Sequence, residues 1–234
     1  MKLLIIVPAY NEAGNLDSVI SDLRLHCPSA DVLVVNDCST DDSAAVLARL
    51  GVAHLNLPVN LGIGGAVQSG YRYAQENGYD VAVQFDGDGQ HDAAFLADLL
   101  APVLSGEADV AIGSRFLEKE GFQSTVLRRF GIDFLSRLIR DLSGVDVKDV
   151  TSGMRAVNAK MISVYAREYA QDYPEPEALL LAGKCGAKVA EIPVRMRERL
   201  SGKSSINPIK SVYYMIKVTL TLLLSAVVVP EELR

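Results

Sequence analysis

The stretch that decides the fold is VAVQFDGDGQHD at residues 81–92, an apolar run that leads directly into acids and an amide. Residues 81–85 have the composition of a buried strand. Asp86, Asp88, Gln90 and Asp92 follow with almost no spacing, and Gly87 and Gly89 let the backbone approach a ligand closely. Because like charges repel when they are brought together, the turn requires a cation or an array of donors to balance it. The stretch therefore predicts a strand that ends in a cation-binding turn.

Apolar runs and helical stretches alternate on both sides of this segment. Strands are expected at residues 3–7, 31–35 and 53–57, and helices at 16–26, 42–50 and 65–77. Strands that are apolar throughout, separated by helices, are typical of a mostly parallel sheet covered on both faces. The predicted fold class is therefore α/β.

Composition and charge exclude several classes of protein. The 234 residues include 23 basic and 29 acidic side chains, and the net charge of −6 disfavours a general nucleic-acid binder. Three cysteines without metal-ligand spacing favour a reducing, cytoplasmic setting over a disulfide framework or a zinc site. The opening MKLLIIVPAYNE is too short in its apolar part for a signal peptide and is expected to be a buried strand.

Polar turns follow three of the predicted strands, at residues 8–12, 36–41 and 86–90. Ligands of such sheets bind at the carboxyl ends of the strands, so the three turns are expected to converge on one edge. Helix capping is the alternative for each turn taken singly. Carboxylate and amide oxygens suit Mg²⁺ or Mn²⁺ with open positions for a diphosphate, whereas the spacing does not match a calcium-binding EF-hand loop.

Six blocks in order carry a resemblance to a known family. They read VPAYNEAGNL, VVNDCSTDDS, NLGIGGAVQSGYRYA, FDGDGQHD, DVAIGSRF and DVTSGMRAVN. Together they resemble the family 2 glycosyltransferases, especially the dolichol- or polyprenol-phosphate sugar synthases, over residues 3–206. The resemblance implies a Rossmann-like GT-A fold, a nucleotide-diphosphate sugar donor, Mg²⁺ or Mn²⁺, and transfer with inversion.

The resemblance also assigns residues to the donor. The metal ligands would be Asp86, Asp88 and Gln90. Where the family usually reads DDGS, this chain has Asn36 and Cys38 in place of the first acid and the glycine. The nucleotide-sugar-binding residues would be Pro8, Tyr10, Glu12, Val35, Asp37, Asp86, Gly87, Asp88, Arg199 and Lys203.

An acceptor phosphate would be bound by Arg115, after the strand DVAI, and by Arg129 in a basic amphipathic helix. A guanidinium binds phosphate with two parallel hydrogen bonds, although a solvated surface arginine is the alternative. A phosphomonoester is largely anionic at neutral pH, so little base catalysis is required. The catalytic residues would be Asp149, Asp88 and Arg115, with Asp149 alternatively a helix cap or the partner of Arg155.

A hydroxyl acceptor would change this assignment. Relatives that transfer to a hydroxyl carry a catalytic acid in the region of Glu175 and Glu177, and one of these two would then be the base. The reading preferred from the sequence is transfer to undecaprenyl or dolichyl phosphate for cell-envelope glycans or glycoconjugates. The alternatives are a transferase that extends a lipid-linked saccharide at a sugar hydroxyl, and a catalytically inactive nucleotide-binding subunit of a membrane glycosylation complex.

The last part of the chain differs from the rest, which divides it into a catalytic domain at 1–208 and a membrane-associating apolar helix at 209–234. Residues 209–229 carry only Lys210 and Lys217 as charges. A lysine at mid-membrane is costly, so a helix lying in the membrane interface is favoured over a true span. A helix packed on the domain or in a dimer seam is the alternative. The expected location is the cytoplasmic face of the membrane, with a small membrane protein or a second copy as possible partner.

Overall fold

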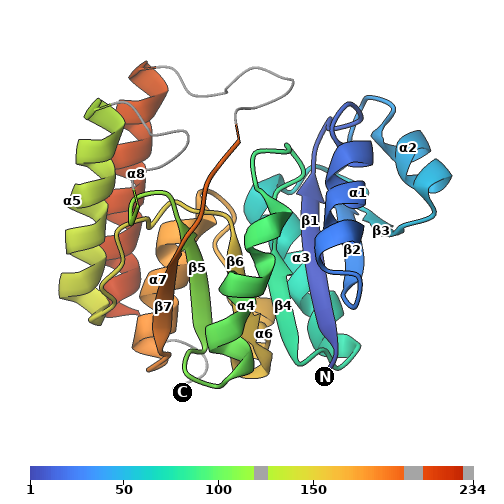
Figure 1. Cartoon of the computed structure of the whole chain (residues 1–234). Helices are drawn as coiled ribbons and strands as arrows, with labels where there is room; N and C mark the ends of the chain where they lie inside the picture. Colours follow the sequence, from blue (N-terminus) through green and yellow to red (C-terminus); the bar gives the residue numbers. More distant parts are fainter. Residues whose placement is uncertain (119–125, 198–207, 229–234) are drawn as a thin grey trace.

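A sheet of seven strands runs through the computed structural model, which describes residues 1–118, 126–197 and 208–228 (Figure 1). Its order is β3-β2-β1-β4-β6-β5-β7. The strands are β1 (Leu3–Ala9), β2 (Asp31–Asn36), β3 (Ala53–Asn56), β4 (Val81–Gln84), β5 (Val110–Ser114), β6 (Arg155–Asn158) and β7 (Val189–Pro193).

Parallel pairing dominates this sheet, as the apolar runs predict. β1 pairs in parallel with β2 and β4, β2 with β3, and β5 with β7. β6 runs antiparallel to both of its neighbours, β4 and β5. This reversal was not predicted, because β6 is only four residues long and begins with Arg155, so it lacks the apolar run that marks the other strands.

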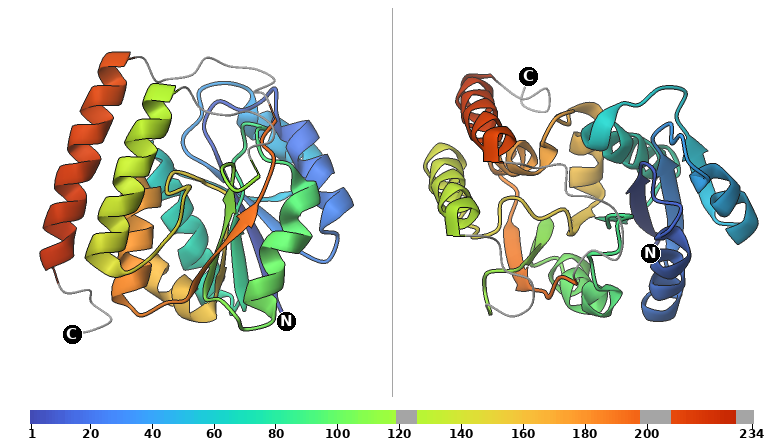
Figure 2. Two further views of the ribbon diagram at one scale, coloured as in Figure 1. Left: turned by 60° about the vertical axis from the view of Figure 1, so that its left-hand side comes forward. Right: turned by 90° about the horizontal axis from the view of Figure 1, so that it is seen from above.

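Helices cover both faces, which confirms the predicted α/β layering (Figure 2). Side chains of β1 alternate between the faces: Leu4 and Ile6 enter one core, and Ile5 and Val7 enter the other. The first core is closed by α3 (Gly62–Glu76), α5 (Val126–Ser143), α6 (Ala159–Arg167), α7 (Pro174–Lys184) and α8 (Pro208–Val227). The second core is closed by α1 (Leu16–His26), α2 (Ser43–Leu50) and α4 (Leu96–Leu104), which follows the short 3₁₀ turn η1 (Ala93–Phe95).

The C-terminal segment, which was expected to be a membrane-associating helix, forms α8 and packs against α5 and α7 (Figure 2). Val218 and Leu222 on its inner side are buried in the first core. Lys217 forms an ion pair with Asp172. Lys184 of α7 donates to the carbonyl oxygens of Ser225 and Ala226, 2.6 and 3.2 Å away, and so caps the end of α8. Within the described residues, no helix has the length and apolar character that crossing a bilayer requires.

Candidate active site

The acidic turn follows β4 as the sequence predicts. Asp86, Asp88 and Gln90 are half-buried and alternate with buried Gly87 and Gly89. Gly89 has a φ of +75°, a conformation that favours glycine. A Cβ at Gly87 would lie 2.9 Å from the carbonyl oxygen of Pro8, so only glycine allows β1 and the turn to approach this closely.

A cavity of about 400 Å³ lies at the carboxyl ends of β1, β2 and β4. It brings together seven of the predicted donor-binding residues, including those of the acidic turn and Asp37, which directly follows β2. Those seven are Pro8, Tyr10, Glu12, Asp37, Asp86, Gly87 and Asp88. Val35 is different, because its side chain is fully buried in the core and is not available to a nucleotide. Arg199 and Lys203 lie outside the described residues.

Hydrogen bonds fix the turn after β2, where the chain departs from the usual DDGS pattern. The buried Asn36 amide donates to Asn56 Oδ1 at 2.8 Å, and its oxygen accepts from the backbone N–H of Ser39 at 3.2 Å. Asp37 Oδ1 accepts from the backbone N–H of Leu61 at 2.7 Å. Cys38 has a φ of +59°, the left-handed conformation for which a glycine is suited. Asn36 therefore has a structural role, and the turn keeps its glycine-like geometry without the glycine.

Glu12 is oriented by a neighbour on the first turn. The amide of Asn15, which is buried, donates to Glu12 Oε2 at 2.6 Å. The Glu12 backbone N–H donates to Ser43 Oγ at 3.0 Å, which ties the turn after β1 to the start of α2. The carboxylate is thus held at the wall of the cavity, where a ribose hydroxyl could donate to it.

Asp86 is held by side chains that the sequence analysis did not single out. His91 Nε2 lies 3.0 Å from Asp86 Oδ2, and the amide of Gln84 donates to Oδ1 at 3.3 Å. Burial by itself raises the pKa of the Asp86 carboxyl, but His91, Gln84 and the charge of Arg155 outweigh it and leave the pKa below its usual value. Gly153 completes the enclosure, because a Cβ there would lie 2.5 Å from Asp86 Oδ2.

The guanidinium of Arg155, fully buried beneath this site, donates to backbone carbonyls. Its partners are the carbonyl oxygens of Ser152 and Glu175, both at 2.8 Å, and of Val150 at 3.3 Å. The buried positive charge favours the ionised form of Asp86. Arg155 is therefore not the partner of Asp149, which was one of the two alternatives for that acid.

Asp149 is instead paired with Arg115. Arg115 Nε and Nη2 each lie 2.6 Å from an oxygen of Asp149, whose side chain is fully buried. Arg115 Nη2 also donates to Thr151 Oγ1 at 2.8 Å. The backbone N–H of Asp149 donates to Glu191 Oε1 at 2.8 Å, which fixes the loop to β7. Arg115 is thus a buried and fully oriented group rather than a solvated surface arginine.

Arg129 lies beside the same aromatic ring as Arg115. Its guanidinium carbon is 3.7 Å from the centre of the Phe116 ring, and that of Arg115 is 5.1 Å from the same centre. Arg129 also pairs with Asp133 at 3.0 Å. The two arginines predicted for an acceptor phosphate are therefore neighbours, although they lie on separate elements.

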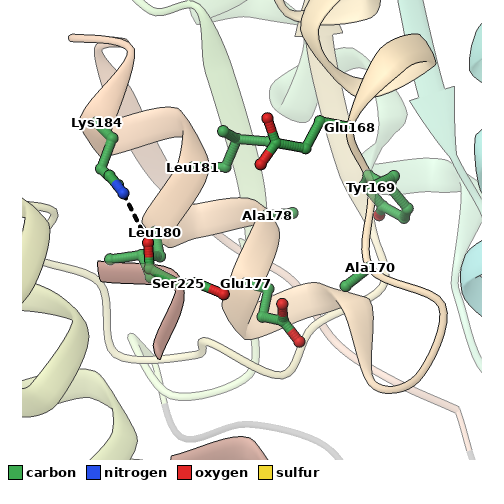
Figure 3. A pocket seen from close by; sticks show the side chains of 9 residues that line it. All are labelled: Glu168, Tyr169, Ala170, Glu177, Ala178, Leu180, Leu181, Lys184 and Ser225. Carbon is green, nitrogen blue, oxygen red and sulfur yellow. Dashed lines mark hydrogen bonds between the residues drawn. The ribbon is translucent and has the colours of Figure 1, made fainter. Parts of the chain in front are cut away.

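Glu175 and Glu177 lie two residues apart at the start of α7, but their side chains are in different environments. Burial raises the pKa of Glu175 to about 7, against the opposing charge of Arg155, and Asp86 and Arg115 also act on it electrostatically. Glu177 instead lines a separate small cavity of about 50 Å³ between α7 and α8 (Figure 3). Burial also raises the pKa of Glu177, although a hydrogen bond with Ser225 opposes the shift. Of the two, Glu175 is the one whose carboxyl interacts electrostatically with Asp86 and Arg115.

The acidic turn fits a cation that arrives with its substrate. Asp86 and Asp88 could supply two hard oxygen ligands, and Mg²⁺ or Mn²⁺ usually completes its shell with phosphate oxygens and water. Across the described residues, no group of three or more His, Cys, Asp or Glu side chains is arranged to hold an ion. Gln90 is not among the residues that line the donor cavity, and its backbone N–H donates to Asp88 Oδ1 at 3.0 Å.

Comparison with known proteins identifies relatives of the chain. An undecaprenyl-phosphate mannosyltransferase of Micrococcus luteus is 32% identical over 218 residues, covering 88% of each chain. A polyprenol monophosphomannose synthase of Mycolicibacterium smegmatis is 30% identical over 225 residues, covering 88% of this chain and 81% of that protein.

The solved structures give the fold. Glucosyl-3-phosphoglycerate synthase of Mycobacterium tuberculosis, determined with Mn²⁺, UDP and glucosyl-3-phosphoglycerate, superposes with a TM-score of 0.72 at 20% identity, covering 96% of this chain and 79% of that one. The fold is accordingly GT-A-like, as expected. The sequence profile described as "Glycosyl transferase family 2" matches residues 4–165. The chain therefore belongs to glycosyl transferase family 2 and is a glycosyltransferase.

Proposed function

We propose that this glycosyltransferase moves one sugar from a nucleotide diphosphate to a polyprenyl phosphate, with inversion at the anomeric carbon. The observation that carries the donor half is the cavity that places Asp37 and Glu12 together with the acidic turn. The acceptor half is supported by the names of the relatives from Micrococcus luteus and Mycolicibacterium smegmatis.

On the donor side, Asp37 and Glu12 accept hydrogen bonds from the base and the ribose. Asp86 and Asp88, with Gln90 nearby, would hold Mg²⁺ or Mn²⁺ against the diphosphate. When bound, such a cation neutralises charge on the departing diphosphate. Arg199 and Lys203 remain predicted to close over it.

On the acceptor side, the phosphate is already nucleophilic, since its second pKa is about 6. One of its oxygens forms a bond to the anomeric carbon, while the bond from that carbon to the diphosphate oxygen breaks and its electron pair leaves with the nucleoside diphosphate. Arg115 and Arg129 orient the phosphate for this in-line displacement. Asp149 acts as a positioning residue, because both its oxygens are directed at Arg115.

The face formed by α5 and α8 supports a location at an anionic membrane surface. Along α8 an exposed apolar row continues for most of the helix, and on α5 Phe130 and Phe134 are exposed. The two helices carry six basic and two acidic residues, in a chain whose net charge is −6. Apolar contact together with local positive charge is what docks a helix in an anionic interface. The exposed row on α8 consists of Ile216, Leu220, Leu223, Leu224 and Val227.

A second candidate function is transfer to a sugar hydroxyl of a lipid-linked saccharide. The observation that favours it is Glu175, whose pKa of about 7 suits a general base at neutral pH. A hydroxyl acceptor would lose its proton to this carboxylate, whereas a phosphate acceptor would not need it. Glu175→Gln therefore separates the two functions: it abolishes transfer to a hydroxyl and leaves transfer to a phosphate largely intact.

The test is incubation of the full chain with undecaprenyl phosphate and a panel of labelled nucleotide sugars, with Mn²⁺ or with EDTA. The lipid is supplied in vesicles that also contain membranes of the expression host, and the same vesicles without the protein are the blank. We expect label from at least one donor to move into the organic phase, and EDTA to prevent the transfer. Glu175→Gln and Arg115→Lys are assayed in parallel. Label that stays aqueous for every donor, or transfer that is lost in Glu175→Gln and kept in Arg115→Lys, would refute the phosphate acceptor.

A further inference from the structure

No role is predicted for His91 from the sequence, although its side chain lies buried beside Asp86. Its side chain is 1% exposed, and Nε2 lies 3.0 Å from Asp86 Oδ2. The ring packs against Phe85 with its centre 5.3 Å away. The backbone of His91 forms an isolated bridge with Met196, beyond the end of β7. Packing and backbone pairing therefore fix the imidazole before any ligand arrives.

Nδ1, the second ring nitrogen of His91, shows which group donates the hydrogen bond between His91 Nε2 and Asp86 Oδ2. Nδ1 of His91 is buried and has no hydrogen-bond partner in the described part of the chain. A proton on Nδ1 would face no acceptor, and a buried donor without an acceptor is costly. The proton therefore belongs on Nε2, and His91 donates it to Asp86.

The opposite oxygen of Asp86 is held in the same way. Gln84, fully buried at the end of β4, donates its amide to Asp86 Oδ1 at 3.3 Å. The Gln84 amide is oriented in turn, because its oxygen accepts from the hydroxyl of Tyr169 at 3.3 Å. Each carboxylate oxygen of Asp86 thus has its own buried side-chain donor, and Gly153 packs so close to Oδ2 that an added Cβ would lie 2.5 Å from it. The Asp86 side chain remains 32% exposed, which leaves it accessible to a cation. The Oδ1 atom of Asp88 accepts from the backbone N–H of Gln90 at 3.0 Å.

We propose that His91 is a positioning residue that, with Gln84, locks the Asp86 carboxylate into its metal-binding orientation. This inference rests on the proposed function, in which Asp86 holds the cation. Groups that orient a metal ligand usually change metal affinity by about 10- to 100-fold when they are removed. His91 then acts on the metal through Asp86 and touches neither the metal nor the donor.

The geometry supplies a matched set of variants. His91→Phe keeps the ring and its packing against Phe85 but removes the donor. In His91→Gln the amide nitrogen is as many bonds from Cα as Nε2, so it can replace the donor. In His91→Asn the amide nitrogen corresponds to Nδ1 and falls short of Asp86. If His91 served only in packing, the Mn²⁺ affinity of the three variants would follow the size and shape of the new side chain, and His91→Phe would be nearest the parent.

The experiment measures Mn²⁺ binding to the full chain in the presence of UDP, by the electron paramagnetic resonance signal of free Mn²⁺, with a protein-free mixture of Mn²⁺ and UDP as the blank and melting in EDTA as the test of folding. We expect His91→Phe and His91→Asn to raise the Kd for Mn²⁺ about 10- to 100-fold, and His91→Gln to stay within about threefold of the parent. Gln84→Leu is the second variant should His91→Phe fail to fold, and it should weaken binding in the same direction.

Asp88→Asn separates this inference from the proposed function. If the parent binds Mn²⁺ and Asp88→Asn loses it, the metal site stands, and unchanged binding in His91→Phe or in His91→Asn then overturns the role of His91. If the parent and Asp88→Asn bind Mn²⁺ equally or not at all, the metal site fails, and the role of His91 fails with it.

Discussion

Arg115 and Asp149 form a buried, bidentate ion pair, in which Nε and Nη2 of the arginine each lie 2.6 Å from an oxygen of the aspartate. Removing one partner of such a pair leaves the other charge buried without compensation, at a cost of about 3–5 kcal/mol. We therefore expect Asp149→Asn to lower the free energy of unfolding by roughly 3 kcal/mol, as measured by urea denaturation. Asp133→Asn breaks the exposed Arg129–Asp133 pair and should cost less than about 1 kcal/mol. Equal losses in the two variants would contradict the buried character of the first pair.

Glu175 makes the stability of the protein dependent on pH. Its pKa is raised from 4.5 to about 7, so between these values the folded protein keeps a proton that the unfolded chain releases. Stability therefore falls as pH rises through this window. Glu175→Gln removes the effect, and we expect it to be more stable than the parent at about pH 8 but not at about pH 4, in thermal melts. The exposed Glu107→Gln is the control, and a parallel shift in it would contradict the assignment to Glu175.

Cys38 carries a conformational cost that a glycine would remove. Its φ of +59° disfavours any residue with a Cβ by about 1–2 kcal/mol, although glycine loses more entropy on folding. We expect Cys38→Gly to be more stable than Cys38→Ala by up to about 1 kcal/mol in urea denaturation. Cys38→Ala keeps the unfavourable φ while removing the thiol, so it isolates the backbone effect. The opposite order would show that the turn relaxes when the side chain changes.

Gly153 leaves space for the Asp86 carboxylate. Because an added Cβ would lie 2.5 Å from Asp86 Oδ2, Gly153→Ala must displace the carboxylate. We expect Mn²⁺ binding and sugar transfer to fall together by at least about tenfold. Gly113→Ala is the matched control, since its methyl group would meet the Val194 side chain at 3.0 Å. Normal Mn²⁺ affinity in Gly153→Ala would show that Asp86 does not need this orientation.

The exposed side of α8 should decide membrane binding. Leu220 and Leu224 are 56% and 67% exposed, one turn apart on the same face. Changing both to Gln should release the protein from anionic vesicles in a sedimentation assay while leaving its melting temperature unchanged. Leu25→Gln, at an equally exposed position on α1, should have no effect. If Leu25→Gln were also released from the vesicles, binding would depend on exposed apolar side chains in general rather than on α8.

Much of the fold could be predicted because its signal is local. The apolar runs before Pro8 and Asp86 identify strands, and the polar residues after them identify the donor edge. Pairings between distant residues gave no such signal: Asp149 lies 34 positions from Arg115. His91 stands beside acids that already suggested a metal, so its contact with Asp86 emerged only from the structure. Glu175 and Glu177 could not be ranked from the sequence, because their environments depend on how α7 packs.

The reversal of β6 has a consequence for how this enzyme can diversify. Residues on β1, β2, β4 and β5 reach the reactive edge after their strands end, whereas Ser152 and Gly153 reach it before β6 begins. The antiparallel strand thus separates the half β3-β2-β1-β4, which borders the cavity, from a half formed by β5 and β7 that is followed by Arg115. Under the proposed function, the loops that follow β5 and β7 would set the acceptor, whereas the loop before β6 would serve the donor side, because it holds Gly153 against Asp86.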